Sequence, residues 1–361
     1  MKIQVKQFIF FASCKFIYVV FAYSVYSKFS SLGDVYRYLG EGSSVTGGKG
    51  TYFVQLIGEF LYSTFCGIPI LTSLPLIIIS SSIMVYILGK VRRTSEDYIF
   101  CLLYIMPFFS MWSSLISKEF FTTNALIFFA ISVFERYVCG RVDTLDPMKR
   151  LLFLLSDFCI ITLVFLLKVS YFPLLLIFYF GSIFIYSKFS VLKKYCLLLL
   201  LLFLFIWIVY LFSIEYSTFF LDFISNLPDH FSGGTTRNLD LENNPENLFI
   251  YLPYYVFISF LSSTFTEVID NPIRAFVVIE GLGFLLSYLY FIALFINNVK
   301  NFSYSRKLFF LLCLFVSFMF MITHVFYGVM NGGSGMRYRT NFEFFIVLIL
   351  YLSSRYSNRN I

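Results

Sequence analysis

Long apolar runs alternate with short polar connections over most of the 361 residues of this chain. A helix needs about 20 mostly apolar residues to cross a lipid bilayer. The pattern therefore predicts an all-α polytopic membrane protein, with residues 1–361 forming a single membrane domain. About ten transmembrane helices are expected, at roughly 8–27, 68–89, 98–116, 120–138, 151–168, 171–187, 195–214, 275–297, 308–327 and 342–353.

Two further apolar runs, 52–66 and 249–265, do not fit as single spans, because counting either one alone would invert every later loop. We expect both to lie at the outer face as interfacial or re-entrant segments, which require protein or a watery cavity around their backbone. Simple amphipathic surface helices are the alternative. The largest outer-face loop region is predicted over 215–274, and its middle is rich in Gly, Pro, Asn and Asp, as loops are.

Composition and charge placement support membrane embedding and set the orientation. The chain is 59% hydrophobic and only 13% charged, which is far from the balance of a soluble domain. If the N-terminus is cytoplasmic, the cytoplasmic loops contain most of the 27 Lys and Arg residues and few of the 20 acidic residues, and the C-terminus is cytoplasmic too. The formal charge of +7 is therefore a topology signal and does not indicate a nucleic-acid partner.

The sequence lacks the residue motifs that several common kinds of chemistry require. The seven cysteines form no CxxC pair or Cys/His cluster, so neither a disulfide framework nor a zinc site is predicted. The chain has no Walker A loop, no GxGxxG motif, no HExxH motif and no nucleophile elbow. We expect no cofactor and no metal.

The most conspicuous polar stretch is 328–343, where Arg337 and Arg339 flank Tyr338 on the predicted outer face. Arginine stays protonated and presents a planar set of donors that suits phosphate. The glycines just before it permit tight turns whose backbone N–H groups could also face an anion. Anchoring to lipid headgroups by snorkelling side chains is the alternative interpretation.

Other candidates lie near the same predicted face. Asp34 and Arg37 are one helical turn apart, so both could face one cavity, or they could form a local salt bridge. Lys118 and Glu119 lie in a tight helical hairpin, where boundary charges are candidates for function. A self-neutralising cap is the alternative for that pair.

Three more residues are weaker candidates for binding substrate. Arg274 precedes a predicted span and could instead pair with Asp270 or Glu267. Arg237 lies in the polar outer loop, where a solvated side chain is an equally simple interpretation. His324 lies near the outer end of a predicted span, where a neutral imidazole could act as a base or could be a hydrogen-bonded core residue.

The order of these features resembles a known family. An acidic residue and a tyrosine follow the first span (Asp34 and Tyr36), a proline-to-glutamate stretch joins two spans (107–119), and a Gly-x-Arg-Tyr stretch (335–338) follows a long outer loop. This order resembles the Wzy-type O-antigen polymerases and the related exopolysaccharide polymerases of bacteria. The resemblance covers most of the chain as architecture and includes no single diagnostic motif.

The resemblance implies a multi-pass glycosyltransferase of the bacterial inner membrane that acts at the periplasmic face, where the 215–274 loop region would lie. It would polymerise oligosaccharide repeat units linked to undecaprenyl diphosphate, without a metal. The implied partners are that lipid-linked oligosaccharide, membrane lipid, a flippase and a chain-length regulator. The family's functional arginines point to Arg337 and Arg339, then to Arg274 and Arg237.

The residues suggest roles for this chemistry. Arginines would stabilise the charge that develops on a diphosphate leaving group. Asp34, Glu119 and His324, in that order, are the candidates for accepting a proton from the acceptor hydroxyl. Two alternatives stay open: a transporter or flippase of lipid-linked saccharide, and a glycosyltransferase that adds one sugar from a polyprenyl phosphate, for which Asp34 would be the acidic site.

Overall fold

The structure is a computed structural model that describes residues 2–28, 32, 34–40, 49–90, 95–138, 147–187, 190, 196, 199, 203, 251–330 and 332–355. Every regular element in these ranges is helical. The principal α-helices are α1 (Lys2–Ser24), α2 (Val35–Tyr38), α3 (Lys49–Thr64), α4 (Pro69–Thr72), α5 (Leu74–Lys90), α6 (Ser95–Tyr104), α7 (Pro107–Trp112), α8 (Lys118–Val133), α9 (Pro147–Leu167), α10 (Phe172–Tyr186), α14 (Leu252–Leu261), α15 (Phe265–Asp270), α16 (Ile273–Asn298), α17 (Tyr304–Met330), α18 (Gly332–Arg339) and α19 (Glu343–Arg355). Short 3-10 turns η4 (Val169–Tyr171) and η5 (Val299–Asn301) and a π-helical segment η2 (Phe134–Val138) join some of them.

Among the described residues, five helices are long and apolar enough to cross a membrane. They cover Gln4–Lys28, Pro69–Gly89, Val169–Tyr186, Ile273–Asn301 and Tyr304–Val325, and Leu151–Leu167 is a shorter apolar helix. The all-helical class is therefore confirmed for the described residues, and the five apolar helices suit a membrane-embedded protein, but ten spans are not confirmed. The predicted span 195–214 lies almost entirely outside the described residues.

The predicted continuous span 98–116 is wrong, because the helix breaks in the middle. Helix α6 ends at Tyr104, and α7 begins at Pro107 and ends at Trp112. Proline has no N–H to donate and its ring clashes with the preceding turn, so a helix cannot run unchanged through Pro107. The new N-terminus is satisfied by a distant side chain, since the Glu280 carboxylate accepts hydrogen bonds from the Phe108 and Phe109 N–H groups at 2.9 and 2.8 Å.

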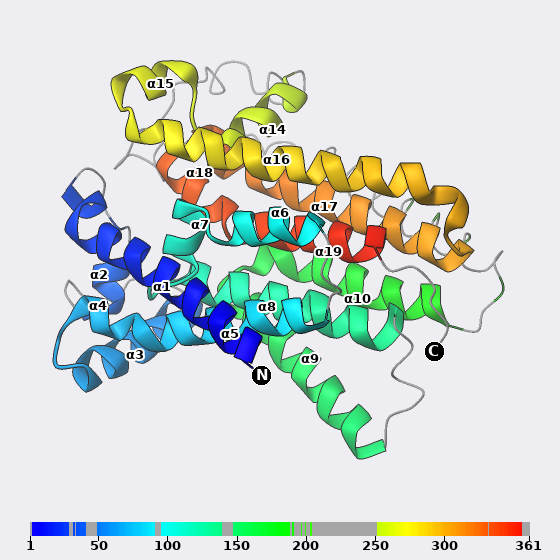
Figure 1. Ribbon diagram of the computed structural model, residues 1–361, viewed down its shortest axis with the longest axis horizontal. Coiled ribbons are helices and arrows are strands. Elements are labelled where there is room, and N and C mark those ends of the chain that lie inside the picture. Colours follow the sequence, from blue (N-terminus) through cyan, green and yellow to red (C-terminus); the bar gives the residue numbers. More distant parts are fainter. Residues whose placement is uncertain are drawn as a thin grey trace, which may run out of the picture.

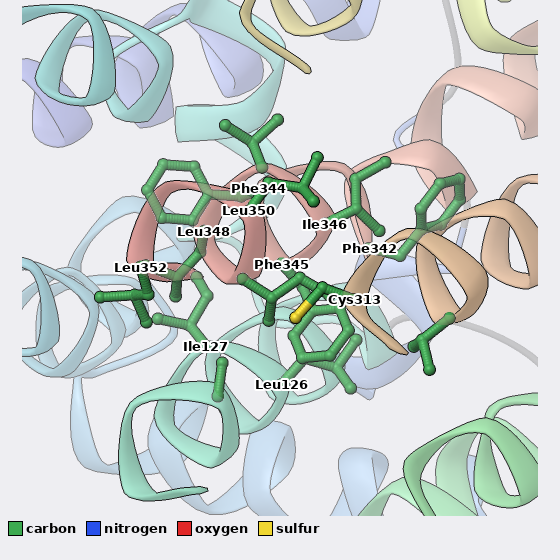
Figure 2. Close-up of a cluster of buried hydrophobic side chains, with 14 of the residues drawn as sticks. Leu126, Ile127, Cys313, Phe342, Phe344, Phe345, Ile346, Leu348, Leu350 and Leu352 are labelled. Atoms are coloured by element: carbon green, nitrogen blue, oxygen red, sulfur yellow. The ribbon is translucent and has the colours of Figure 1, made fainter. Parts of the chain in front are cut away.

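The last predicted span, 342–353, forms α19, but this helix is the centre of the core. It packs against α8, α16 and α17, and nearly all of its side chains are buried. Figure 2 shows α19 side chains such as Phe344, Phe345 and Leu348 among Leu126 of α8 and Cys313 of α17. A helix surrounded by protein on all sides needs no particular bilayer-spanning length, which explains why this run is short.

The two unassigned apolar runs form short helices at one end of the bundle. Residues 52–64 of the first run lie in α3, and residues 252–261 of the second run form α14, while residue 265 begins α15. Figure 1 shows α2, α3, α15 and α18 toward the left and the connection between α16 and α17 at the right. The last turn of α14 is buried against α16, α17 and α18, so protein groups surround the backbone there, as a re-entrant segment requires.

Candidate functional site

Several of the predicted site residues meet at one end of the bundle. The Arg337 guanidinium lies 3.8 Å from the Asp34 carboxylate and 3.5 Å from Glu119, measured between nearest N and O atoms. Arg37 lies 3.5 Å from the other oxygen of Asp34. The structure therefore brings together side chains from the segment before α2, from α8 and from α18, which are about 300 residues apart in sequence. We call the group Asp34, Arg37, Lys118, Glu119, Lys168, Arg337 and Tyr338 the end cluster.

A capping interaction at the start of α8 positions Lys118 and Glu119. The Ser117 side chain accepts a hydrogen bond from the Phe120 N–H and so fixes the first turn of α8. Glu119 lies in this first turn, where the partial positive charge of a helix N-terminus favours a carboxylate. Its side chain is almost completely buried and faces Arg337. Burial lowers the pKa of the Lys118 ammonium, while the nearby Glu119 and Asp34 carboxylates oppose this change.

Arg337 is the best-held cation of the end cluster. Its guanidinium lies 5.9 Å from the centroid of the Trp112 ring and 5.0 Å from that of Tyr338, and it donates a hydrogen bond of 3.1 Å to the Tyr338 hydroxyl. Burial disfavours its charge, but Glu119, Tyr338 and Asp34 together outweigh burial, so the pKa of Arg337 is raised above its ordinary value. It is a permanent positive charge between two carboxylates.

The glycine-rich stretch before Arg337 is helical, in contrast to the predicted tight turns. Glycine inside a helix costs about 1 kcal/mol relative to alanine, so its presence needs a packing reason. A Cβ at Gly335 would lie 2.7 Å from the Gly328 Cα, and a Cβ at Gly328 would lie 2.7 Å from the Ser259 Cα. The glycines thus let α18, α17 and α14 approach closely, which holds Arg337 in position.

Lys168 belongs to the end cluster but was missed by the sequence reasoning, which counted it as the last residue of a span. It lies between α9 and η4, outside the spanning helices, and its Nζ is 3.6 Å from the centroid of the Tyr338 ring. Burial lowers the pKa of Lys168 to about 7. The available signal was its place at the predicted outer end of a span, where the positive-inside rule depletes lysine.

Arg339, predicted to act beside Arg337, is in a separate and completely buried cluster. Its Nε lies 2.7 Å from a Glu343 oxygen and its Nη2 lies 3.8 Å from Glu280. Its Nη1 donates a hydrogen bond of 2.6 Å to the Phe260 carbonyl at the end of α14. We call Glu280, Arg339 and Glu343 the core ion cluster. Arg339 has no exposed surface, and its contacts join α14, α16 and α19. We therefore interpret its role as structural.

The remaining predicted binding residues lie outside the end cluster as defined. Arg274 forms an ion pair of 2.9 Å with Glu267, next to the capping box that starts α15. His324 is buried in α17, with its ring 5.1 Å from that of Phe342. Arg237 lies outside the described residues. The Arg274–Glu267 ion pair is one of the two ion pairs that the sequence predicted as alternatives to substrate binding by Arg274.

Charged groups within the spans have partners too. Lys15 of α1 donates a hydrogen bond of 2.6 Å to the Ser113 hydroxyl just after α7, and its Nζ is 4.3 Å from the centroid of the Tyr104 ring. Arg136 of η2 pairs with Asp157 of α9. These contacts join helices across the bundle, as expected where charge is costly.

Within the described ranges, His, Cys, Asp and Glu side chains form no group of three that could hold a metal ion. The end cluster is a mixed set of basic side chains and carboxylates at one end of the helix bundle. Comparison with protein-family models, with curated proteins and with solved structures found no match to this chain.

Proposed function

We propose that this chain is a glycosyltransferase of the bacterial inner membrane that polymerises oligosaccharide repeat units carried on undecaprenyl diphosphate. The end cluster is the proposed active site, and both termini are placed in the cytoplasm. The observation that carries the proposal is the position of Arg337. It is a permanent, well-held cation beside two carboxylates. Our proposal places it at the outer face, where the orientation rule normally depletes positive charge.

The proposed reaction needs a cation for the leaving group and an acceptor for a proton. The hydroxyl oxygen of the acceptor sugar forms a bond to the anomeric carbon of the donor, and the bond from that carbon to the phosphate oxygen breaks. The electron pair leaves with the lipid diphosphate, where the guanidinium of Arg337 would stabilise it. The hydroxyl proton passes to a carboxylate.

Asp34 suits the role of proton acceptor better than Glu119. The Asp34 side chain is 40% exposed, while that of Glu119 is only 4% exposed and faces Arg337. An acceptor sugar can therefore reach Asp34 directly. Glu119 would keep the Arg337 guanidinium oriented, and Arg37, which pairs with Asp34, would orient the carboxylate.

The proposal is tested in a strain that lacks the gene. We expect lipopolysaccharide with a single repeat unit, with the polymer ladder restored by the wild-type gene but not by Asp34→Asn at equal protein level. Glu59→Gln, at a carboxylate of α3 that accepts a hydrogen bond from Gln55, is the matched control and should restore the ladder. An unchanged ladder in the deletion strain would refute the polymerase function.

A transporter of lipid-linked saccharide is the second candidate, and two observations favour it. Transporters commonly use broken helices with charges near the middle of the membrane. Here the helix break between α6 and α7 is capped by Glu280, which belongs to the core ion cluster, and Lys15 binds Ser113 just beyond α7. A purified protein that moves a lipid-linked oligosaccharide across liposomes without lengthening it would favour this candidate over polymerisation.

A further inference from the structure

Lys168 and Arg337 converge on the same tyrosine. The Lys168 Nζ lies 3.6 Å from the centroid of the Tyr338 ring, and the hydroxyl of that ring accepts a hydrogen bond of 3.1 Å from Arg337 Nη2. The charge of Arg337 disfavours the charged form of Lys168, so the two cations repel each other. An anion between or beside them would relieve the repulsion, so the arrangement is typical of an anion-binding site.

The backbone around Lys168 is fixed on both sides. The Lys168 N–H donates to the Val164 carbonyl at 2.7 Å, and the Lys168 carbonyl accepts from the Tyr171 N–H at 3.0 Å. The start of α3 covers this turn so closely that a Cβ at Gly50 would lie 2.1 Å from the Leu166 carbonyl oxygen. Lys168 is thus presented from a rigid support, which is the property that electrostatic stabilisation of a reacting group requires.

The end cluster contains more basic side chains than carboxylates. Among the described residues, the cluster contains the cations Arg37, Lys118, Lys168 and Arg337 but only the carboxylates Asp34 and Glu119. With every group ionised, the surplus is two positive charges. A diphosphate that joins a sugar to a lipid carries two ionised oxygens, so its charge would balance the surplus.

We propose that Lys168 is a further substrate-binding residue that, together with Arg337, holds the diphosphate of the lipid-linked donor. This inference rests on the proposed function, because it concerns the same site. Arg337 would bind through its planar set of donors, and Lys168 would add a compact ammonium from the α9 side.

The groups that surround Lys168 predict how its protonation responds to a bound anion. The pKa of Lys168 is lowered to about 7, because burial and the nearby Arg337 and Lys118 together outweigh the opposing effect of the Glu119 and Asp34 carboxylates. Tyr338 lies against Lys168, and His324 of α17 also interacts with it electrostatically. A bound diphosphate would act in the same direction as the carboxylates, so binding at pH 7.5 should take up a proton onto Lys168.

Calorimetry with undecaprenyl diphosphate as the probe tests the inference. Full-length protein in phosphatidylcholine nanodiscs is titrated at pH 7.5 in two buffers with different ionisation enthalpies, so that proton uptake is measured beside affinity. We expect Lys168→Met to weaken binding by about tenfold and to remove most of the proton uptake. Lys168→Arg should bind without that uptake, because its charge is permanent. Lys300→Met, at the opposite end of the bundle, is the control.

The outcomes separate this inference from the proposed function. If the wild-type protein does not bind the probe, the proposed function fails. If it binds the probe and Lys168→Met binds equally well, Lys168 is not a ligand and only the inference fails. If phosphatidylglycerol titrated in place of the probe binds as tightly as undecaprenyl diphosphate, the site holds ordinary lipid headgroups, and the inference is overturned.

Discussion

Arg337 and Arg339 show how two neighbouring arginines can have different tasks. Both lie on α18, and residues two apart in a helix point in nearly opposite directions. Arg337 therefore faces the end cluster, and Arg339 faces the core ion cluster. From the sequence, both arginines were predicted to lie at one anion site, because tight turns were expected in this stretch. The two side chains point to different sides only because α18 is helical.

This division predicts opposite phenotypes for the two arginines. Arg337→Ala should reduce polymer formation by about 10²–10³-fold, because it removes a charge from the leaving group. It should lower the melting temperature less than Arg339→Met does, because Lys118 and Lys168 still lie near the buried Glu119 carboxylate. Arg339→Met should lower stability by about 3–5 kcal/mol, because it leaves two buried carboxylates without their cation. Thermal unfolding of the purified proteins and polymer length in cells measure the two effects. A stable but inactive Arg339→Met would instead place Arg339 in the reaction.

The lowered pKa of Lys168 predicts how the initial rate depends on pH. Its pKa is lowered from the ordinary lysine value to about 7, so the side chain is charged below that pH and neutral above it. If the charge helps to capture the donor, kcat/KM should fall as the pH rises through about 7. Lys168→Arg should remove this fall, since arginine stays charged over the whole range. An unchanged pH profile in Lys168→Arg would assign the titration to another group.

Helix α3 connects a surface segment to the end cluster. Its Gly58 packs directly on α2, where a Cβ would lie 2.1 Å from the Tyr38 carbonyl oxygen and 3.2 Å from Ile116. Asp34 immediately precedes α2. The position of α3 therefore helps to fix the carboxylate that we propose as the proton acceptor.

Gly58→Ala should therefore impair both stability and activity. The added methyl group meets backbone, which cannot move aside as a side chain can, and overpacking of this kind costs about 1–3 kcal/mol. Gly89→Ala in α5 is the matched control, because its nearest neighbour is the flexible Gln4 amide at 3.3 Å. Melting temperature and polymer length should fall in the first variant only. Equal behaviour of the two variants would show that α2 and α3 do not need this close contact.

The apolar runs were sufficient to predict most helices, but they could not show what surrounds each one. A run of about 20 apolar residues looks the same whether lipid or protein covers it, so the central place of α19 was not predictable from 342–353 alone. Pro107 was a visible signal for the break in 98–116, and a count of apolar residues overlooks it. The burial of Arg339 depends on the Phe260 carbonyl, 79 residues away, and local sequence does not contain such contacts.

The end cluster and the basic residues around η5 lie toward opposite ends of the helix bundle. Helices α2 and α18, which carry Arg37 and Arg337, lie toward the left in Figure 1, and the connection between α16 and α17, which contains η5, lies at the right. The basic residues Lys300, Arg306 and Lys307 are near that second end, which agrees with a cytoplasmic location. The end cluster would then face the outside, where a lipid-linked donor with no nucleotide is the available substrate.

Cysteine labelling of the full-length chain tests this orientation. In a background without the native cysteines, Ser63→Cys at the exposed end of α3 and Lys300→Cys in exposed η5 are compared in intact spheroplasts with an impermeant maleimide. We expect Ser63→Cys to be labelled from outside and Lys300→Cys only after lysis, because the two positions lie at opposite ends of the bundle. The reverse pattern would place the end cluster in the cytoplasm. Arg337, Lys168 and Asp34 would then face nucleotide-sugar donors, and polymerisation at the periplasmic face would be untenable.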